Sequence, residues 1–260
     1  MCFPFEAVPP IPPVAGGAVD SEDLVLADAS GNKFAAFAVR SDSPSGAGMV
    51  VLPDVRGLFR FYEELALRFA EQGVNAVAID YFGRSAGVGK RGEDFPFMEH
   101  IPQTTQAGIA ADTAAAVAYL RSPAGGSCTS VFAVGFCFGG AASWNQAANG
   151  HGLSGVIGFY GRPGAGRDGA PGPISRVSEF ECPVLCLMGG ADQGIPAEAV
   201  EEFRVALEKA GVEAEVKIYD GAPHSFFDRT YEEHAAASAD AWQRMLDFVR
   251  RNQARVASPA

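Results

Sequence analysis

Cys137 occupies the centre of a G-x-C-x-G pattern that could present a reactive nucleophile. A buried apolar run over residues 131–134 suits a strand, and Gly135-Phe-Cys137-Phe-Gly139-Gly140 leads into small residues that suit a helix. A nucleophile elbow has this strand–turn–helix pattern, usually with serine, and its glycines leave room for a strained turn. The helix N-terminus would stabilise both a thiolate and an oxyanion. The alternative is a buried structural cysteine, but the surrounding pattern favours the nucleophile.

A nucleophile elbow predicts two partners in a fixed chain order, an acid after a later strand and a histidine after the last strand. The apolar run at residues 183–188 leads directly to Asp192, and the run at residues 215–219 leads to His224. Asp192 would orient His224, and His224 would accept the proton of Cys137. The sequence therefore predicts a cysteine–histidine–aspartate arrangement.

Other interpretations of these two partners remain open. Asp220 and Asp228 are rival acids, but both lie on the same loop as the histidine, whereas Asp192 follows an earlier strand. Asp192 could also be an ordinary turn residue and His224 a surface-loop histidine. The chain has only 4 histidines, so a histidine at the predicted place is informative.

The elements that must position these residues alternate between strands and helices. Two strands separated by a turn open the pattern, and buried strands and amphipathic helices then follow one another to the end of the chain. The expected strands cover residues 24–27, 33–39, 49–52, 74–79, 130–134, 155–160, 183–188 and 215–219, and the expected helices cover residues 58–69, 109–120, 138 onward, 196–210 and 231–250.

This alternation predicts the α/β class, with a mostly parallel central sheet flanked by helices on both faces. The proline-rich residues 1–18 are expected to form an extended arm, and residues 19–260 a single domain. Two long irregular stretches, residues 81–104 and 161–179, are expected to be functional loops, because ligands of such sheets bind near the carboxyl ends of the strands.

Charge and composition exclude several classes of partner. The 260 residues carry a formal net charge of −11, which disfavours nucleic acid and anionic membrane surfaces. No apolar run is long enough to span a membrane, and no basic residue precedes an apolar block at the N-terminus as in a signal peptide. The odd number of 5 cysteines does not indicate a disulfide framework, so a cytoplasmic location is expected.

Neither a metal nor a cofactor site is expected. Cys182 and Cys186 could share a face of one strand, but no third or fourth ligand has a matching spacing. Two G-x-G-x-x-G matches, at residues 87–92 and 164–169, are not followed by a helix start. A dinucleotide site needs a strand before and a helix after this motif, so we expect none.

Three segments together resemble the dienelactone hydrolase family of α/β-hydrolases. They are the cysteine elbow Gly135-Phe-Cys137-Phe-Gly139-Gly140, the acid segment Gly190-Ala-Asp192 and the histidine segment Pro223-His224-Ser225-Phe226. The resemblance extends over residues 19–249 and implies the α/β-hydrolase fold. It also implies a Cys–His–Asp triad that acts on lactones or other carboxylic esters through a thioester acyl-enzyme, without metal or cofactor.

The same resemblance adds an acidic residue after the third strand that activates the thiol. Asp54 occupies that place, where the family commonly has glutamate, although Asp54 could also be a turn residue. The loop that carries Asp54 is expected to supply one oxyanion-hole N–H from Val55, and Phe138 the other.

Substrate binding is the third expectation from the resemblance. The family's type members hold the carboxylate of their substrate with two arginines; Arg84 matches one, whereas the second position is Asp228, with Arg229 one residue later. Tyr81 is expected to belong to an apolar pocket wall. Either arginine could instead be a solvated loop charge.

The sequence therefore predicts a cysteine-dependent hydrolase of carboxylic esters or lactones, with a small-molecule substrate and a monomeric or small homo-oligomeric state. A thioesterase or a peptidase on the same scaffold is one alternative. A catalytically silent ligand-binding protein of the same fold is another, although a complete triad disfavours it.

Overall fold

The central sheet has eight strands and matches the predicted alternation. The computed structural model describes residues 3–14, 19–166 and 170–256. The strands are β1 (Val19–Ala27), β2 (Lys33–Ser41), β3 (Ala47–Leu52), β4 (Asn75–Ile79), β5 (Ser130–Phe136), β6 (Gly155–Phe159), β7 (Val184–Gly189) and β8 (Ala214–Tyr219).

Strand order places the carboxyl ends of six strands at one edge of the sheet. The order is β1-β2-β4-β3-β5-β6-β7-β8. The pairs β1–β2 and β2–β4 are antiparallel, and all pairs from β4 and β3 to β8 are parallel. Every loop that follows β3, β4, β5, β6, β7 or β8 therefore starts at the same edge, where ligands of open α/β sheets bind.

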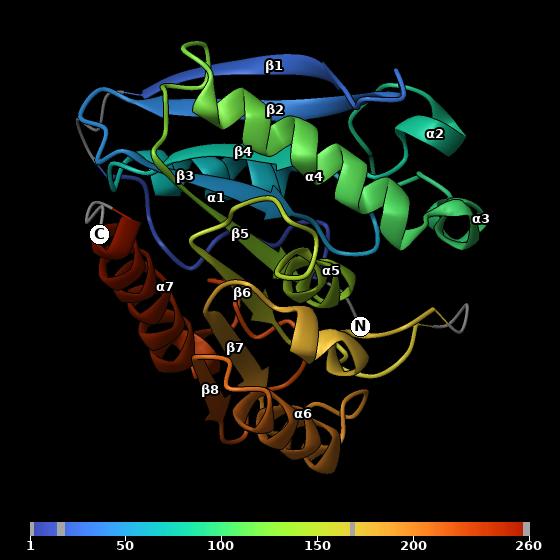
Figure 1. Ribbon diagram of the computed structural model, residues 1–260, viewed down its shortest axis with the longest axis vertical. Helices are drawn as coiled ribbons and strands as arrows, with labels where there is room; N and C mark the ends of the chain where they lie inside the picture. Colours follow the sequence, from blue (N-terminus) through green and yellow to red (C-terminus); the bar gives the residue numbers. More distant parts are fainter. Residues whose placement is uncertain (1–2, 15–18, 167–169, 257–260) are drawn as a thin grey trace.

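Helices cover both faces of the sheet (Figure 1). The main helices are α1 (Arg60–Ala70), α4 (Gln106–Arg121), α5 (Phe138–Gln146), α6 (Ala197–Lys209) and α7 (Ala235–Val256). Rings of α1 and α7 meet between Phe69 and Trp242, with centroids 5.0 Å apart, and rings of α5 and α6 meet between Trp144 and Phe203 at the same distance. The α/β-hydrolase fold predicted from the sequence is confirmed.

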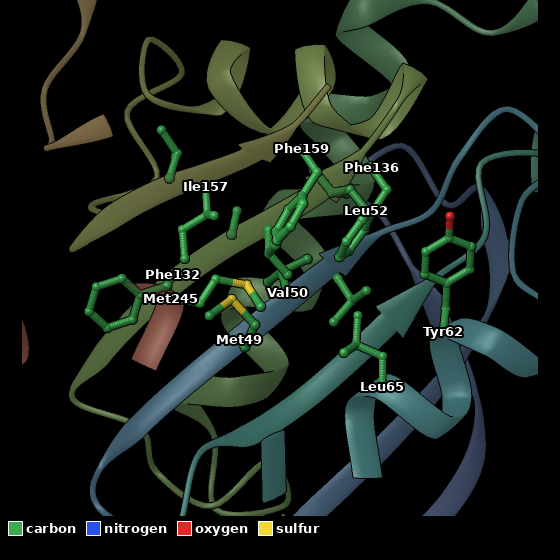
Figure 2. Packing of buried hydrophobic residues seen from close by; sticks show 14 of the residues in the cluster. Met49, Val50, Leu52, Tyr62, Leu65, Phe132, Phe136, Ile157, Phe159 and Met245 are labelled. Atoms are coloured by element: carbon green, nitrogen blue, oxygen red, sulfur yellow. The ribbon is translucent and has the colours of Figure 1, made fainter. Parts of the chain in front are cut away.

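The core fills both sides of the sheet because its inner strands are apolar on both faces. Strands β3, β4, β5 and β6 are buried at every position, as expected for parallel strands covered by helices on each side. Figure 2 shows Met49, Val50 and Phe132 packed toward Met245 of α7, and Phe136 beside Phe159 near the end of β5. The apolar rings of the core therefore continue up to the residue that precedes Cys137.

The two stretches expected to be irregular contain short helices. The segment after β4 holds α2 (Gly83–Ala86), α3 (Phe97–His100) and the 3-10 turn η1 (Ile101–Gln103). The segment after β6 holds the 3-10 helix η2 (Pro173–Glu179), and another 3-10 turn, η3 (Glu232–His234), precedes α7. Each helix in the two stretches is at most 7 residues long, which explains why hydropathy periodicity did not reveal it.

The described part of the N-terminal arm, residues 3–14, packs on the domain. Phe3 is 2% exposed and Ala7 is 5% exposed, so both belong to the core. The rest of the expected arm, residues 1–2 and 15–18, lies outside the described residues. No helix in the described part of the chain is both long enough and apolar enough to cross a membrane.

Candidate active site

Cys137 lies on a sharp turn between β5 and α5. Its backbone has φ 56° and ψ −113°, a conformation that costs a residue with a side chain on the order of 1–3 kcal/mol. Phe138 begins α5 immediately afterwards, so Cys137 is the residue before the helix. The turn thereby places a half-buried thiol at the helix N-terminus, where the helix dipole favours a negative charge.

The glycines of the elbow are required by close backbone contacts. A Cβ at Gly135 would lie 1.8 Å from the carbonyl oxygen of Gly139, and a Cβ at Gly139 would lie 2.2 Å from those of Leu52 and Pro53. A Cβ at Gly140 would lie 2.5 Å from the carbonyl oxygen of Phe159. The elbow is therefore wedged between the ends of β3 and β6, and only residues without side chains fit there.

Asp192 and His224 form a hydrogen-bonded pair at the same edge of the sheet. The distance from His224 Nδ1 to Asp192 Oδ2 is 2.6 Å, and the other oxygen, Oδ1, accepts the N–H of Gly194 at 2.8 Å. An ionised carboxylate only accepts hydrogen bonds, so His224 carries its proton on Nδ1. The second ring nitrogen, Nε2, is therefore the one that can exchange a proton with a reacting group.

The surroundings of Asp192 stabilise the negative charge of its carboxylate. Burial of its side chain raises the pKa of Asp192. This effect is outweighed by the hydrogen bond and charge of His224 and by the backbone N–H groups of Gly194 and Ile195, so the pKa lies below the ordinary value. Asp192 is therefore an anion at neutral pH. Its loop is tied to the histidine loop by backbone hydrogen bonds, including one from Ala191 N–H to Ala222 O at 2.9 Å.

Tyr160 joins the histidine loop to the elbow. Its ring lies 4.8 Å from the ring of His224, measured between centroids. The preceding residue, Phe159, accepts the N–H of Cys137 through its carbonyl oxygen at 3.0 Å. Tyr160 and Ser225 have φ angles of 34° and 61°, so with Cys137 three of the four non-glycine residues with positive φ in the described chain lie around this site. Such concentration of strained backbone is typical of active sites.

The loop after β3 is fixed by two tyrosines. The hydroxyl of Tyr81 donates to the carbonyl oxygen of Pro53 at 2.8 Å, and the hydroxyl oxygen of Tyr62 accepts the N–H of Asp54 at 2.8 Å. Within the described residues, the N–H groups of Val55 and Phe138 donate to no protein acceptor. The two residues predicted to form the oxyanion hole therefore have donors available for a ligand.

Asp54 is fully buried and its carboxylate is bound by Arg56. Oδ2 accepts from Arg56 Nη2 at 2.6 Å, and Oδ1 accepts from Arg56 Nε at 3.2 Å and from the Arg56 backbone N–H at 2.9 Å. The guanidinium also lies 4.4 Å from the ring centroid of Phe59. A permanent cation therefore neutralises the carboxylate that the sequence suggested as an activator of the thiol, and that role stays a prediction.

The other described cysteines are in different surroundings. Cys128, Cys182 and Cys186 are buried free thiols. Burial raises the pKa of Cys128, raises that of Cys182 to about 12, and raises that of Cys186 well above its usual value. These three thiols are therefore protonated near neutral pH, and a protonated thiol is a poor nucleophile.

Comparison with known proteins agrees with this geometry. The model of the dienelactone hydrolase family matches residues 34–253. The chain belongs to the dienelactone hydrolase family. Over 222 residues it is 31% identical to a carboxymethylenebutenolidase of Rhodococcus opacus, covering 81% of this chain and 83% of that protein. An Escherichia coli K12 protein provisionally named carboxymethylenebutenolidase is 30% identical over 216 residues, covering 81% and 79% of the two chains.

A solved structure of the same family has a similar fold. A crystal structure from Klebsiella pneumoniae, provisionally assigned as a dienelactone hydrolase, superposes with a TM-score of 0.78 at 27% identity. The alignment covers 89% of this chain and 98% of the Klebsiella chain. The similarity predicted from three short segments thus extends over most of the chain, and the prediction of the family is confirmed.

Two of the residues predicted to bind substrate have other partners in this family member. The guanidinium of Arg84 bonds the carboxylates of both Asp28 and Asp112, the latter at 2.5 Å. Arg229 is exposed, and its backbone N–H donates to the carbonyl oxygen of Val8 in the arm at 3.1 Å. The positive charge of Arg84 is therefore matched by two anions, which leaves it little capacity to bind the carboxylate of a substrate.

Tyr81 lies closer to the reactive group. It is 3% exposed, its ring centroid is 5.5 Å from that of Phe138, and a Cβ at Gly139 would lie 2.8 Å from its hydroxyl oxygen. Burial and the nearby negative charges of Asp54 and Asp80 raise its pKa well above the usual value. Tyr81 therefore acts as a neutral hydrogen-bond donor that braces the β3 loop against the elbow.

Sequence reasoning did not single out Arg162, which follows β6 by three residues. Its Nη2 donates to the carbonyl oxygen of Gly194 at 2.9 Å, on the loop that holds Asp192. Arg162 thus braces the acid loop from the neighbouring strand. Nothing in the spacing of these residues indicates the contact, because it joins two loops that are 32 positions apart.

Proposed function

We propose that this hydrolase cleaves carboxylic esters or lactones, with Cys137 as nucleophile, His224 as general base and acid, and Asp192 as the residue that orients His224. The observation that carries the proposal is the strained turn at Cys137, with φ 56°, at the edge of the sheet where His224 and Asp192 are hydrogen-bonded at 2.6 Å. Backbone strain at one half-buried thiol has a cost, and presentation of a nucleophile accounts for it.

The reaction proceeds in two steps. Cys137 Sγ transfers its proton to His224 Nε2 and attacks the carbonyl carbon, while the carbonyl π electrons move to oxygen. The oxyanion accepts hydrogen bonds from the N–H groups of Val55 and Phe138, which donate to no protein acceptor among the described residues. Collapse expels the alkoxide, which takes the proton from His224 and leaves a thioester on Cys137.

Hydrolysis of the thioester uses the same groups in reverse. His224 Nε2 removes a proton from water as the water oxygen attacks the thioester carbon. The sulfur then leaves and is protonated by His224, so that the acid product is released and Cys137 is restored. Throughout, the Asp192 carboxylate stabilises the positive charge that His224 carries for part of each step. A lactone substrate gives a hydroxy acid, because its alcohol and acid remain joined.

Uncharged substrates fit the described site better than anionic ones. The guanidinium groups of Arg56 and Arg84 are already paired with carboxylates. Asp228, at the position where the family's type members carry an arginine, is itself a buried acid. An anionic substrate would therefore have to compete with protein carboxylates for each of these two arginines, at a net protein charge of −11.

We also place the enzyme in a reducing compartment such as the cytoplasm. Support comes from the four described cysteines, which are all free thiols. A reducing compartment also protects a catalytic thiol, because a reactive thiolate is the form that oxidants attack.

The test is a panel of activated esters and lactones with and without a carboxylate, run on wild type, Cys137→Ala and Cys128→Ala. We expect turnover of the uncharged members by wild type and by Cys128→Ala, and none by Cys137→Ala. Mass spectrometry of the quenched wild-type reaction should show an acyl adduct on the peptide that contains Cys137. Turnover retained by Cys137→Ala would exclude the mechanism, and turnover of thioesters or peptides alone would redirect the substrate class.

A further inference from the structure

We propose that residues 3–8 of the N-terminal arm are a positioning element of the active site. Phe3 holds Tyr160 against His224, and Val8 fixes the loop that carries His224. This inference rests on the proposed function, because it assigns to the arm the placement of the catalytic base.

The first support is the environment of Phe3. The side chain is 2% exposed, and its ring stacks on Phe61 at 4.2 Å between centroids with an interplanar angle of 27°. It meets Tyr160 edge-on at 6.1 Å and lies 6.2 Å from Phe136, the residue before Cys137. Phe3 therefore contacts the ring that lies against His224 and the ring of the residue that precedes Cys137.

The strained backbone of Tyr160 shows why such support matters. A residue with a side chain at φ 34° stays in that conformation only when its surroundings hold it there. The ring of Tyr160 contacts His224 on one side and Phe3 on another, at 4.8 Å and 6.1 Å between centroids. Loss of the Phe3 ring would leave a cavity beside Tyr160. The ring of Tyr160 could move into this cavity, and His224, which packs against it, would shift as well.

The second support is the pairing of Val8 with the histidine loop. The N–H of Val8 donates to Asp228 Oδ1 at 3.2 Å, and the carbonyl oxygen of Val8 accepts the N–H of Arg229 at 3.1 Å. Asp228 is fully buried and also accepts from the backbone N–H and the hydroxyl of Thr230. Buried polar groups need hydrogen-bond partners, and Asp228 finds one of them in the arm, four residues past His224.

The arm also reaches the loop after β3. The ring of Phe5 stacks on that of Phe59 at 5.4 Å, and Phe59 is the ring on which the guanidinium of Arg56 lies. The far end is tied down as well, since the N–H of Val14 donates to a carboxylate oxygen of Glu71 at 3.1 Å. The prolines between residues 8 and 14 stiffen the segment, so anchoring both ends costs little chain entropy.

The decisive measurement compares kcat, KM and melting temperature for Phe3→Ala, Phe3→Leu and two controls, using an uncharged activated ester. Glu6→Ala changes an exposed residue of the same arm. Phe69→Ala removes a buried ring that packs on Trp242, in the contact between α1 and α7. All assays are run at a temperature at which each variant is folded.

We expect Phe3→Ala to lower kcat about 10–100-fold with little change in KM, the loss typical of a misplaced catalytic group. Phe3→Leu should recover most of kcat, because it fills much of the same volume. Phe69→Ala should lower the melting temperature and leave kcat of the folded enzyme unchanged, and Glu6→Ala should change neither. Wild-type kcat in folded Phe3→Ala, whatever its melting temperature, would overturn the proposal.

A second variant, Asp228→Ala, tests the Val8 contact and does not remove a core ring. It should shift the acidic limb of the pH profile of kcat/KM, because that limb reports the pKa of the base and hence its surroundings. An unchanged pH profile and unchanged kcat would show that the Val8 contact is structural only and would contradict the second half of the proposal.

The rate of iodoacetamide labelling at Cys137, followed on its peptide by mass spectrometry, separates this inference from the proposed function. Labelling requires thiolate and a nearby base but no substrate. If wild type hydrolyses no ester or lactone yet Phe3→Ala labels more slowly than Phe69→Ala, the substrate proposal fails and the arm's role stands. If wild type hydrolyses esters and all variants label and turn over alike, the arm's role fails and the function stands.

Discussion

Two loops at the same edge of the sheet each bury a carboxylate, and they use it differently. Asp192, after β7, is hydrogen-bonded to the ring of His224, whereas Asp54, after β3, is bound to the guanidinium of Arg56. Asp192 is 9% exposed and Asp54 is fully buried. The difference between the loops is therefore the partner rather than the burial.

The partner decides whether a carboxylate can contribute to a reaction. In the proposed mechanism the imidazole of His224 gains a proton during turnover, so its attraction to Asp192 grows as the transition state forms. Only an interaction that strengthens in the transition state accelerates the reaction. The guanidinium of Arg56 is charged throughout the reaction, so its attraction to Asp54 is the same in the ground state and in the transition state. This ion pair therefore stabilises the conformation of the β3 loop instead.

The largest effect expected from this comparison is in Asp192→Asn. The amide keeps the size of the side chain but removes the charge and can present an N–H to His224, which favours the wrong tautomer. We expect kcat to fall about 10³–10⁴-fold, as when the acid of a serine-protease triad is replaced by its amide. Steady-state kinetics on an uncharged ester measure this fall in kcat. A fall of less than tenfold would contradict the assigned role.

The same variant should also change the pH dependence of stability. The pKa of Asp192 is lowered in the folded protein, so its charge stabilises the fold at pH values above the ordinary carboxyl pKa of about 4. This contribution is lost as the pH falls through the lowered folded-state pKa. The difference in melting temperature between wild type and Asp192→Asn should therefore shrink as the pH is lowered below about 4. A difference that grows on acidification would contradict the assignment.

The next largest effect is expected in the other loop, where Asp54→Asn and Arg56→Gln should behave alike. Each breaks the same ion pair and loosens the loop that presents the Val55 N–H, so we expect kcat to fall about tenfold in both. The melting temperature should fall in both as well. If only Asp54→Asn loses activity and its Cys137 also labels slowly with iodoacetamide, Asp54 acts on the thiol directly, as the family resemblance implies.

A smaller effect is expected from Tyr81→Phe. The change removes one neutral hydrogen bond to Pro53 O and leaves the aromatic ring in place. The cost should be about 1 kcal/mol in stability and a few-fold in kcat, because the β3 loop keeps its other anchors. Denaturant unfolding measures the change in stability, and the ester assay measures the change in kcat. Equal activity of wild type and Tyr81→Phe would show that the Tyr62 and Arg56 contacts suffice to hold the loop.

The smallest effect on catalysis is expected in Arg84→Gln. This arginine resembles Arg56 in being bound by carboxylates, here Asp28 and Asp112. The protein should melt at a lower temperature because two acids lose their cation. The ratio of kcat/KM for a carboxylate-bearing ester to that for its uncharged counterpart should stay as in wild type. A selective loss of the anionic ester would show that Arg84 leaves its carboxylates to bind substrate.

Local sequence patterns were enough to predict most of the fold. The strands after residue 47 were predicted to within about two residues of their observed ends, because each is a short apolar run bounded by turn residues. The elbow was predicted equally well, since its glycines lie close together in the chain. They are required by one local turn, which leaves no room for side chains. The order of nucleophile, acid and histidine then indicated Asp192 and His224, which the structure brings within hydrogen-bonding distance.

Contacts between distant segments were not predictable in this way. Arg84 was matched by its local segment to a substrate-binding position, but its partner Asp28 lies 56 positions away in the turn between β1 and β2. The prolines of the arm predicted an extended segment. No local pattern indicated that Phe3 contacts Tyr160, or that Val8 bonds Asp228, which lies 220 positions away. Pairing over such separations depends on how the elements pack, and a single sequence does not encode it in any local pattern.

The sequence by itself indicated the class of the fold, through hydropathy period and chain order, and the family, through the resemblance of three short segments. It also predicted Cys137 as the nucleophile from the turn chemistry around it. Only the tertiary structure decided which charges remain available at the site. It leaves the Asp192 charge facing a ring that can be protonated. It pairs the charge of Asp54 with the permanent cation of Arg56, and the charge of Arg84 with the carboxylates of Asp28 and Asp112. The physical reason is that electrostatic interaction depends on distance and burial in three dimensions, and both are set by packing.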